Sequence, residues 1–290
     1  MLKKLIPFLF VLLWSTGFIG AKYGLPYAAT GDFLSIRTMA NIAVFVLLIV
    51  ILKQPKLTVK QISHAMVTGL LIHGAYLGGV FGAIEYGIPA GLTAIIVGLQ
   101  PLFTAMLAVF IFKEKVNHWQ WLALILGMSG LILVVSASLA ITHVSKNALL
   151  LAFIALLGIT FGTLYQKRFC QNQPLLPSVC WQYIASLLIF LPIVFVNDTQ
   201  PITWNIEFIL CLAWLVLALS VTAILLFMYM VERGDSSKVT AYFYLVPPAT
   251  ALEAWFLFDE QLALSSILGM VLCAISVYVV NKPTRNIVAP

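Results

Sequence analysis

One glutamate stands inside an apolar stretch of this chain, residues 244–260, which read YLVPPATALEAWFLFDE. A carboxylate in such surroundings, Glu253, is costly unless it has a partner or a task. It could bind an amine, exchange a proton or pair with a base, and the candidate bases are Arg37 and Lys22. Opposite charges at Arg37 and Glu253 would suit a zwitterion such as an amino acid, with its carboxylate near the base and its amine near the acid.

Structural explanations stay open for these three charges. A lysine near the end of a membrane helix often extends its ammonium group to the interface, which would explain Lys22. Arg37 and Glu253 could form a structural clamp between two helices. A carboxylate buried alone takes up a proton, so Glu253, together with His73, is also a candidate for proton coupling.

A second group of polar residues lies on the third predicted helix. Three glycines recur there at intervals of four: Gly74, Gly78 and Gly82. They form a smooth face that lets another helix approach closely. At about 100° per residue, this face points roughly 140–160° away from His73 and Tyr76. The pattern predicts that His73 and Tyr76 line a cavity, with a structural hydrogen bond between helices as the alternative.

Gln100 and Trp14 complete the candidate site residues. Gln100 immediately precedes Pro101, and a proline inside a helix removes a backbone hydrogen bond and forces a kink. Irregular backbone within a membrane is tolerated where it is buried in protein or lines a cavity, so Gln100 is expected at the site. Trp14 could form an aromatic wall, with packing as the alternative. The tandem Pro247 and Pro248 predict a second kink or hinge.

The composition indicates that lipid surrounds the elements that position these residues. The chain has 290 residues, of which 62% are hydrophobic and only 9% are charged, too few charges to cover a soluble domain. A hydrocarbon core about 30 Å thick needs roughly 20 apolar residues of helix. The sequence therefore predicts an all-α membrane protein with ten transmembrane helices, at residues 5–27, 33–52, 62–84, 89–112, 118–139, 148–168, 177–196, 206–231, 239–258 and 264–280.

The distribution of basic residues sets the expected orientation. Of the 16 Lys and Arg residues, only Lys22, Arg37 and Lys146 fall toward the outer side when the N-terminus is placed in the cytoplasm. Cytoplasmic segments of membrane proteins carry the excess of basic residues. Both termini are therefore expected in the cytoplasm.

The sequence also contains an internal duplication. Residues 97–114, VGLQPLFTAMLAVFIFKE, match residues 243–260 at eight of 18 positions with an offset of 146. Leu107 aligns with Glu253, so only one copy carries the unusual carboxylate. The glutamates that both copies share are expected to cap helices, because a carboxylate favours a helix N-terminus. These are Glu114 and Glu260, and the pair Glu85 and Glu232 is interpreted in the same way.

Each half of the chain is predicted to hold five helices. Because five is odd, the second half would enter the membrane inverted relative to the first. We therefore predict two inverted five-helix repeats, residues 1–142 and 143–290. Inverted repeats are typical of secondary transporters, in which two similar bundles alternately expose a central site to the two sides of the membrane.

The chain resembles the EamA-type branch of the drug/metabolite transporter superfamily over essentially its whole length. The resemblance rests on LLWSTGFIGAKYGLP in the first helix, FLSIR in the second, HGAYLGGVFGAIEYGIPAGLTAIIVGLQP in the third and fourth, and the duplicated element. Membership would imply a ten-helix, two-repeat fold with a central cavity, and usually the export of amino acids or other small metabolites. It would not identify the solute.

Other classes of function find little support in the sequence. No Gly-rich phosphate loop is present, the histidines and cysteines lack metal-ligand spacing, and no nucleophile motif is recognisable. We therefore expect no enzyme activity, cofactor or metal. Nucleic acid is not expected as a partner, because the basic residues lie in short gaps between apolar runs. The expected partners are a small-molecule solute and the lipid bilayer, with the protein a monomer or homodimer in the bacterial cytoplasmic (inner) membrane.

The sequence thus predicts a secondary transporter that exports a small amphoteric metabolite by alternating access. Its predicted binding residues are His73, Tyr76, Gln100, Arg37, Glu253, Lys22 and Trp14. Two alternatives remain: proton-coupled efflux of drug-like cations, and a non-transporting membrane scaffold or receptor.

Overall fold

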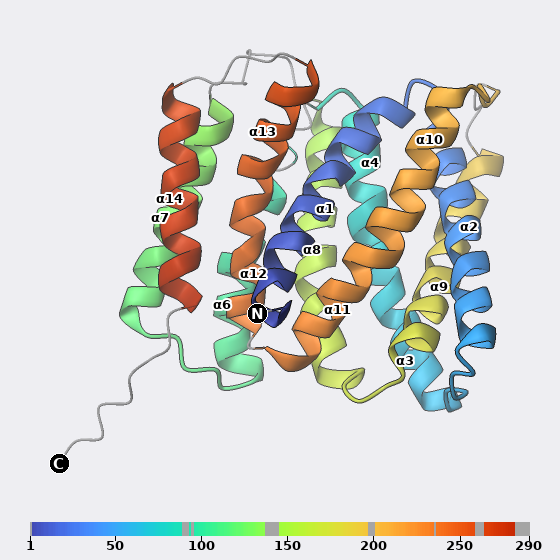
Figure 1. The fold of residues 1–290 in the computed structure, drawn as a ribbon, viewed down its shortest axis with the longest axis horizontal. Helices are drawn as coiled ribbons and strands as arrows, with labels where there is room; N and C mark the ends of the chain where they lie inside the picture. The colour runs from blue at the N-terminus through green and yellow to red at the C-terminus, as the bar shows by residue number, and fades with distance from the viewer. Residues whose placement is uncertain are drawn as a thin grey trace.

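The computed structural model describes residues 2–88, 93, 96–136, 145–196, 201–234, 236–258 and 264–281. Every regular element in these ranges is a helix (Figure 1). The α-helices are α1 (Leu2–Gly24), α2 (Thr30–Ile51), α3 (Val59–Gly69), α4 (Leu77–Glu85), α6 (Gln100–Ile111), α7 (His118–Ser136), α8 (Lys146–Phe169), α9 (Leu175–Val196), α10 (Ile206–Trp214), α11 (Ile224–Arg233), α12 (Ser236–Ala241), α13 (Val246–Phe258) and α14 (Leu264–Asn281). Two π-helices, η1 (Leu70–Tyr76) and η2 (Leu215–Ala223), and one 3₁₀-helix, η3 (Tyr242–Leu245), interrupt the longer spans.

Six stretches of helix among the described residues are long and apolar enough to cross a membrane. They are Leu5–Gly24, Thr30–Ile51, Val59–Glu85, Lys146–Phe169, Leu175–Phe195 and Ile206–Arg233. Shorter apolar helices cover Gln100–Ile111, His118–Leu133 and Ile267–Asn281. The outer ends of most described spans lie within three residues of the predicted ends, but α6 begins at Gln100, 11 residues after the predicted start of its span at residue 89. The predicted boundary between repeats, at 142/143, and the predicted cap Glu260 lie outside the described residues.

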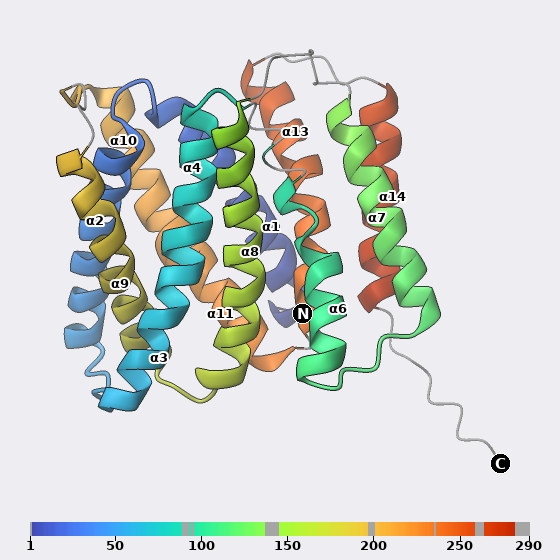
Figure 2. The same ribbon diagram turned by 180° about the vertical axis from the view of Figure 1, so that it is seen from behind.

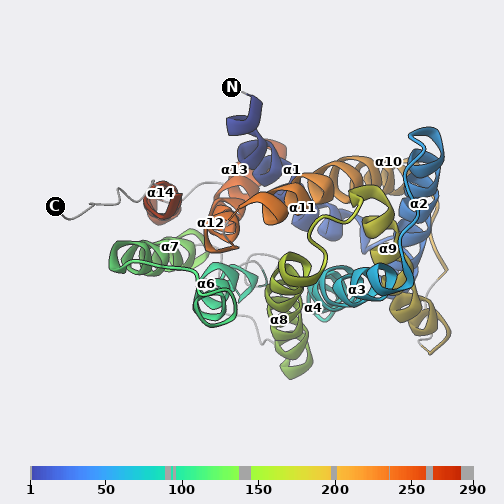
Figure 3. The same cartoon turned by 90° about the horizontal axis from the view of Figure 1, so that it is seen from below.

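The spans form two facing rows closed by a helix pair at each end. Figure 3 shows α10, α11, α1 and α13 in one row and α3, α4, α8 and α6 in the other. The helix pair α7 and α14 packs together at one end, and the pair α2 and α9 at the other (Figures 1 and 2). Helix α1 begins and helix α14 ends on the same face of the molecule (Figure 1).

Helix contacts in the first half have counterparts in the second. Helix α1 packs against the span formed by α10, η2 and α11, while α8 packs against the span formed by α3, η1 and α4. Helix α1 also contacts α13, and α8 also contacts α6. With the sequence offset of about 146, each contact is the repeat equivalent of the other. A duplicated fold produces this pattern.

The two π-helices also occupy equivalent positions, one in the third span of each half. A π turn bonds residue i to residue i+5, so it carries one residue more than an α turn. Such insertions occur frequently at functional sites. Here the π turns change the direction of the side chains that follow. The side-chain directions predicted from the sequence assumed a constant 100° per residue and so lack this change.

The glycine face predicted on the third span packs against neighbouring helices. A Cβ atom at Gly74 or Gly78 would collide with side chains of α9, and one at Gly82 would touch α8. Two other glycines allow the backbones themselves to meet. A Cβ at Gly79 would lie 2.5 Å from a carbonyl oxygen of α8, and one at Gly158 would lie 2.8 Å from a carbonyl oxygen of η1.

The predicted proline kinks coincide with breaks between helices. Pro101 lies in the first turn of α6, which begins after a turn at residues 98–99. Pro247 lies in the first turn of α13, directly after the 3₁₀-helix η3. A proline is tolerated in a first turn because the N–H that it lacks has no partner within the helix. The backbone is therefore irregular just before each proline.

Two of the predicted capping glutamates do cap helices, but helices remote in sequence. Glu85 accepts a hydrogen bond from the backbone N–H of Thr30, the first residue of α2, at 3.0 Å. Glu114 accepts from the backbone N–H and the hydroxyl of Ser237 in α12, at 3.4 and 3.0 Å. It also pairs with the ammonium group of Lys167 at 3.0 Å. These carboxylates fasten separate spans together at their ends.

Candidate solute-binding pocket

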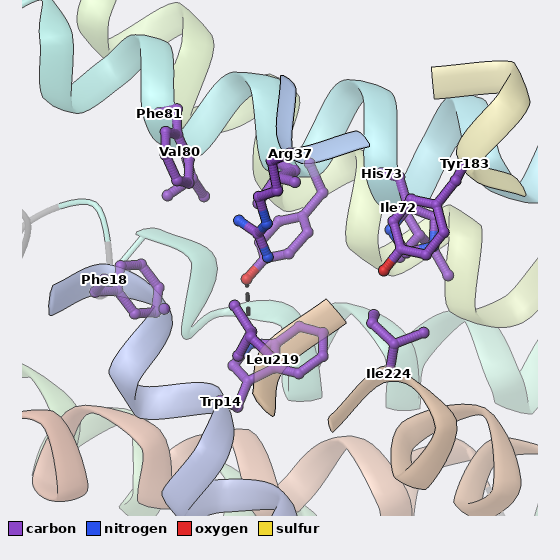
Figure 4. A pocket seen from close by; sticks show the side chains of 13 residues that line it. Trp14, Phe18, Arg37, Ile72, His73, Val80, Phe81, Tyr183, Leu219 and Ile224 are labelled. Carbon is purple, nitrogen blue, oxygen red and sulfur yellow. Dashed lines mark hydrogen bonds between the residues drawn. The ribbon is translucent and has the colours of Figure 1, made fainter. Parts of the chain in front are cut away.

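A pocket lies between the two rows of helices (Figure 4). Its lining consists of Trp14, Gly17, Phe18, Arg37, Ile72, His73, Tyr76, Leu77, Val80, Phe81, Tyr183, Leu219 and Ile224. The empty space within it is about 490 Å³, its mouth included, of which about 30 Å³ is open to the centre of a water molecule. That is room for roughly two waters. A solute of amino-acid size therefore requires the walls to move apart.

Arg37 is the one charged side chain among the described residues that line the pocket. It lies in the second turn of α2 and is only 2% exposed. Its Nε and Nη2 donate hydrogen bonds to the hydroxyl of Ser220 in η2, at 3.1 and 2.9 Å. Its Nη1 has no hydrogen-bond partner among the described residues. The guanidinium is therefore oriented by a neutral group while its charge is left without a counter-charge there.

The Ser220 position is itself fixed by a tyrosine from the other end of the pocket. The hydroxyl of Tyr183, on α9, donates to the backbone carbonyl of Ser220 at 2.8 Å. The ring of His73, on η1, stacks on that of Tyr183 with centroids 4.3 Å apart and planes 28° apart. Residues of α2, α9 and both π-helices thus form one connected cluster.

Trp14 and Tyr76 form an aromatic wall of the pocket. The indole N–H of Trp14, on α1, donates to the hydroxyl oxygen of Tyr76, on η1, at 3.2 Å, a bond drawn dashed in Figure 4. Their rings are nearly parallel, with an interplanar angle of 15°. Trp14 and Phe18 also line a second, smaller cavity of about 230 Å³ of empty space, beside Phe243 and Pro247. These two side chains separate the pocket from the break before α13.

The structure brings together four of the seven residues predicted to bind a solute. Trp14, Arg37, His73 and Tyr76 all line the pocket, whereas Gln100, Glu253 and Lys22 are absent from its described lining. Gln100 is fully buried on α6, and its amide donates to the hydroxyl of Thr163 on α8 at 3.4 Å. Lys22 is exposed in the last turn of α1.

Glu253 is half-buried and faces α1. It accepts a hydrogen bond from the hydroxyl of Ser15 at 2.5 Å, and the hydroxyl of Thr250 donates to the Ser15 carbonyl at 3.3 Å. The second carboxylate oxygen has no partner among the described residues. Glu253 therefore contacts α1 one residue away from Trp14, through a hydroxyl, and its hydrogen bond is with Ser15 and not with Arg37.

Ser220 is a pocket-organising residue that the sequence pattern does not predict. The available signal is a hydroxyl within the apolar run LVLALSVTAILL, residues 215–226. Many such hydroxyls bond to their own helix, as Thr222 does to the carbonyl of Leu217. In the sequence, Tyr183 is one aromatic residue within an apolar run. Its hydroxyl matters because it reaches η2, a contact that sequence spacing does not reveal.

No group of three or more His, Cys, Asp or Glu side chains in the described part of the chain could hold a metal ion. The pocket offers groups that can bind a solute: a fixed cation, hydroxyl and indole groups, and broad aromatic surfaces. The long apolar helices and this pocket define a multi-pass membrane protein with an internal, largely apolar pocket that contains one buried cation.

The chain belongs to the EamA-like transporter family, and is thus a membrane transporter. The family's sequence profile matches it twice, over residues 4–136 and 146–282.

Similar proteins match the chain over nearly its whole length. The uncharacterized transporter YvbV of Bacillus subtilis is 27% identical, with 97% of this chain and 92% of that protein covered. A probable amino-acid metabolite efflux pump of Salmonella typhimurium is 25% identical, with 94% and 93% covered. One crystal structure has a TM-score of 0.80 at 17% identity and covers 98% of both chains. That last likeness concerns the fold alone.

Proposed function

We propose that this protein exports a small amphoteric metabolite, such as an amino acid, by alternating access between two inverted five-helix repeats. One observation carries the proposal: Arg37 is a buried cation in a pocket between membrane helices, and its Nη1 has no partner among the described residues. A charge buried in this way is costly without compensation. A solute with a carboxylate would supply the compensation, and a family of transporters is the setting in which such a solute would pass.

The arrangement of the helices supports the inverted repeats. Contacts of α1 in one half correspond to contacts of α8 in the other, and the π-helices η1 and η2 occupy equivalent positions. The placement of α1 and α14 at one face suits ten crossings with both termini on the same side (Figure 1). The excess of basic residues assigns that side to the cytoplasm of a bacterial cell.

The proposed roles follow from the contacts. Arg37 binds the carboxylate of the solute, while Trp14, Tyr76 and His73 form the walls around its body. Gln100 and Glu253 are proposed to act as the pocket opens, because each lies on a helix, α6 or α13, that begins at a break in the span. Lys22 is proposed to meet the solute at the outer end of α1.

A name among the relatives agrees with this solute class. The Salmonella typhimurium protein is described as a probable amino-acid metabolite efflux pump. At 25% identity, the relationship leaves the particular solute of this chain to be found by experiment.

The test is transport in liposomes. Purified protein is reconstituted, and efflux of a labelled amino-acid panel is compared among the wild type, Arg37→Gln, Glu253→Leu and Arg168→Gln. The last variant removes an exposed charge at the end of α8 and serves as the control. We expect at least one amino acid to move, and we expect Arg37→Gln to stop it while Arg168→Gln leaves it unchanged. Wild-type rates for both Arg37→Gln and Glu253→Leu would contradict the proposed pocket, and no movement of any amino acid would contradict the function.

A proton-coupled cycle is the second candidate, favoured by the carboxylate oxygen of Glu253 that lacks a partner among the described residues. In this scheme Glu253, with His73, exchanges a proton during each cycle, and the solute is a drug-like cation. Efflux should then follow an imposed pH gradient, and Glu253→Gln should remove the pH dependence while it keeps a side chain that can bond to Ser15. An unchanged pH profile in that variant would exclude the relay.

A further inference from the structure

We infer that the pocket recognises its solute by one carboxylate and an apolar body, and that the amine of an amino acid is not required for binding. This inference rests on the proposed function and narrows its solute class. It starts from the charges that surround Arg37. None of the described residues that line the pocket is acidic, and Glu253 contacts Ser15 instead.

The guanidinium group of Arg37 is oriented so that it can bind a planar anion. The Ser220 hydroxyl occupies its Nε and Nη2 and so fixes the plane of the group. The Nη1 edge keeps donors without an acceptor among the described residues. Guanidinium groups bind carboxylates through donors in a fixed planar arrangement. A single cation balances a single negative charge, which favours a monocarboxylate over a doubly charged phosphate.

The other polar groups of the pocket also suit an acceptor. The Tyr76 hydroxyl oxygen receives the indole N–H of Trp14, which leaves the Tyr76 O–H hydrogen as a donor. His73 has one ring nitrogen, Nε2, without a partner among the described residues. If Nε2 of His73 accepted a hydrogen bond from an ammonium group of the solute, it would still be a neutral group and would not balance the ammonium charge. Contacts of an ammonium with aromatic rings add only about 0.5–2 kcal/mol, so the amine gains little here.

The remaining lining is apolar. Phe18, Val80, Phe81, Leu219 and Ile224 surround the space beside Arg37 (Figure 4). Binding pockets of this kind take most of their contact area from hydrophobic surfaces and use a few polar groups to orient the ligand. The body of the solute should therefore be a branched or aromatic hydrocarbon and not a polar side chain.

The experiment compares a matched series of ligands. Detergent-solubilised wild-type protein is loaded with labelled leucine, or with whichever apolar amino acid of the panel binds tighter, and competed with two analogues. 4-Methylpentanoate keeps the carboxylate and lacks the amine; leucinamide keeps the amine and lacks the carboxylate. We expect 4-methylpentanoate to compete within about threefold of leucine, and leucinamide about 30-fold or more weakly.

Variants of Arg37 test whether this residue binds the carboxylate. Arg37→Gln should abolish binding of both carboxylates, Arg37→Lys should retain part of it, and the control Arg168→Gln should retain all of it. Because the ligand series is measured on the wild type, a folding defect in a variant leaves the test intact. Competition by leucinamide equal to that of leucine, or failure of 4-methylpentanoate to compete, would overturn the inference while leaving amino-acid export standing. Absence of binding and transport for every amino acid would overturn the proposed function, and this inference with it.

Discussion

At the scale of single residues, the pocket depends on how Ser220 holds the guanidinium group of Arg37. Ser220 accepts from Arg37 through its side chain and from Tyr183 through its backbone. A neutral acceptor orients the guanidinium without neutralising it, whereas a carboxylate in its place would cancel the charge available to a solute. The cation is thereby kept ready for an incoming anion.

Replacing Ser220 with alanine tests this orientation. The change removes the acceptor of two guanidinium N–H groups, so we expect solute affinity to fall about tenfold, as for the loss of a hydrogen bond to a charged group. The control is Thr222→Ala, two residues away in the same π-helix, whose exposed hydroxyl bonds to its own helix at Leu217. Equal affinities for the two variants in a binding assay would show that Ser220 does not position Arg37.

Tyr183 gives a second prediction at this scale. Tyr183→Phe keeps the ring that stacks on His73 and removes only the bond to the Ser220 carbonyl. A buried carbonyl that loses its donor costs about 1–3 kcal/mol, so the unfolding midpoint in detergent should drop. The conservative control is Tyr165→Phe, whose hydroxyl contacts His64 at a partly exposed site and should shift the midpoint less. The reverse order would contradict the proposed importance of this contact.

At the scale of helices, close packing decides where the spans lie. Gly79 and Gly158 let the third span and α8 approach until a Cβ would strike backbone. We expect Gly79→Ala and Gly158→Ala each to destabilise the protein by about 1–3 kcal/mol, the usual cost of overpacking. Gly82→Ala is the control, since its Cβ would meet only a flexible leucine side chain at 3.1 Å. Thermal unfolding in detergent should rank the control closest to wild type.

A charged cluster joins three helices near one face. Lys167, on α8, pairs with Glu114 after α6 and donates to the carbonyl of Gly234 at 2.9 Å, while Glu114 caps α12 through Ser237. Both side chains are largely shielded, at 13% and 11% exposed. Removing one charge leaves the other poorly compensated. These contacts therefore hold α6, α8 and α12 together at that end.

Charge removal and exchange test this cluster. Glu114→Gln should raise the accessibility of a cysteine placed at Val239 in α12, because the spans separate at that end, whereas the exchange Glu114→Lys with Lys167→Glu should partly restore protection. The readout is the rate of maleimide labelling in detergent, in a background without the native cysteines. Labelling that is as slow in Glu114→Gln as in the parent would show that the cluster does not hold the helices together.

At the scale of the whole molecule, the proposed inversion of the second repeat makes a topological prediction. Lys60 and Glu207 are both the second residue of their helices, α3 and α10, and both are exposed. These helices begin on opposite faces of the molecule (Figure 1). In intact cells, a cysteine at Glu207 should react with an impermeant maleimide, and one at Lys60 should react only after permeabilisation. Labelling of both from outside would contradict the inverted repeats.

Much of the fold could be predicted because membrane spans follow from local composition. Apolar length sets where a helix crosses, so most of the described spans end close to the predicted positions, with the start of α6 at Gln100 as the exception. The prolines marked the breaks before α6 and α13 for the same reason, since a missing N–H acts within one turn. The π-helices could not be predicted, because a shift in the hydrogen-bond register of an apolar helix depends on what packs against it.

The sequence by itself determined the membrane class, the positions of most described helices and the set of polar residues that apolar surroundings make costly. Only the tertiary structure decided which of those residues meet. Arg37 and Ser220 are 183 positions apart, and Ser15 and Glu253 are 238 apart. Hydropathy measures the cost of burying each group alone. Its partner depends on how helices distant in the chain pack together, and that packing placed four candidates around one pocket and Glu253 against α1.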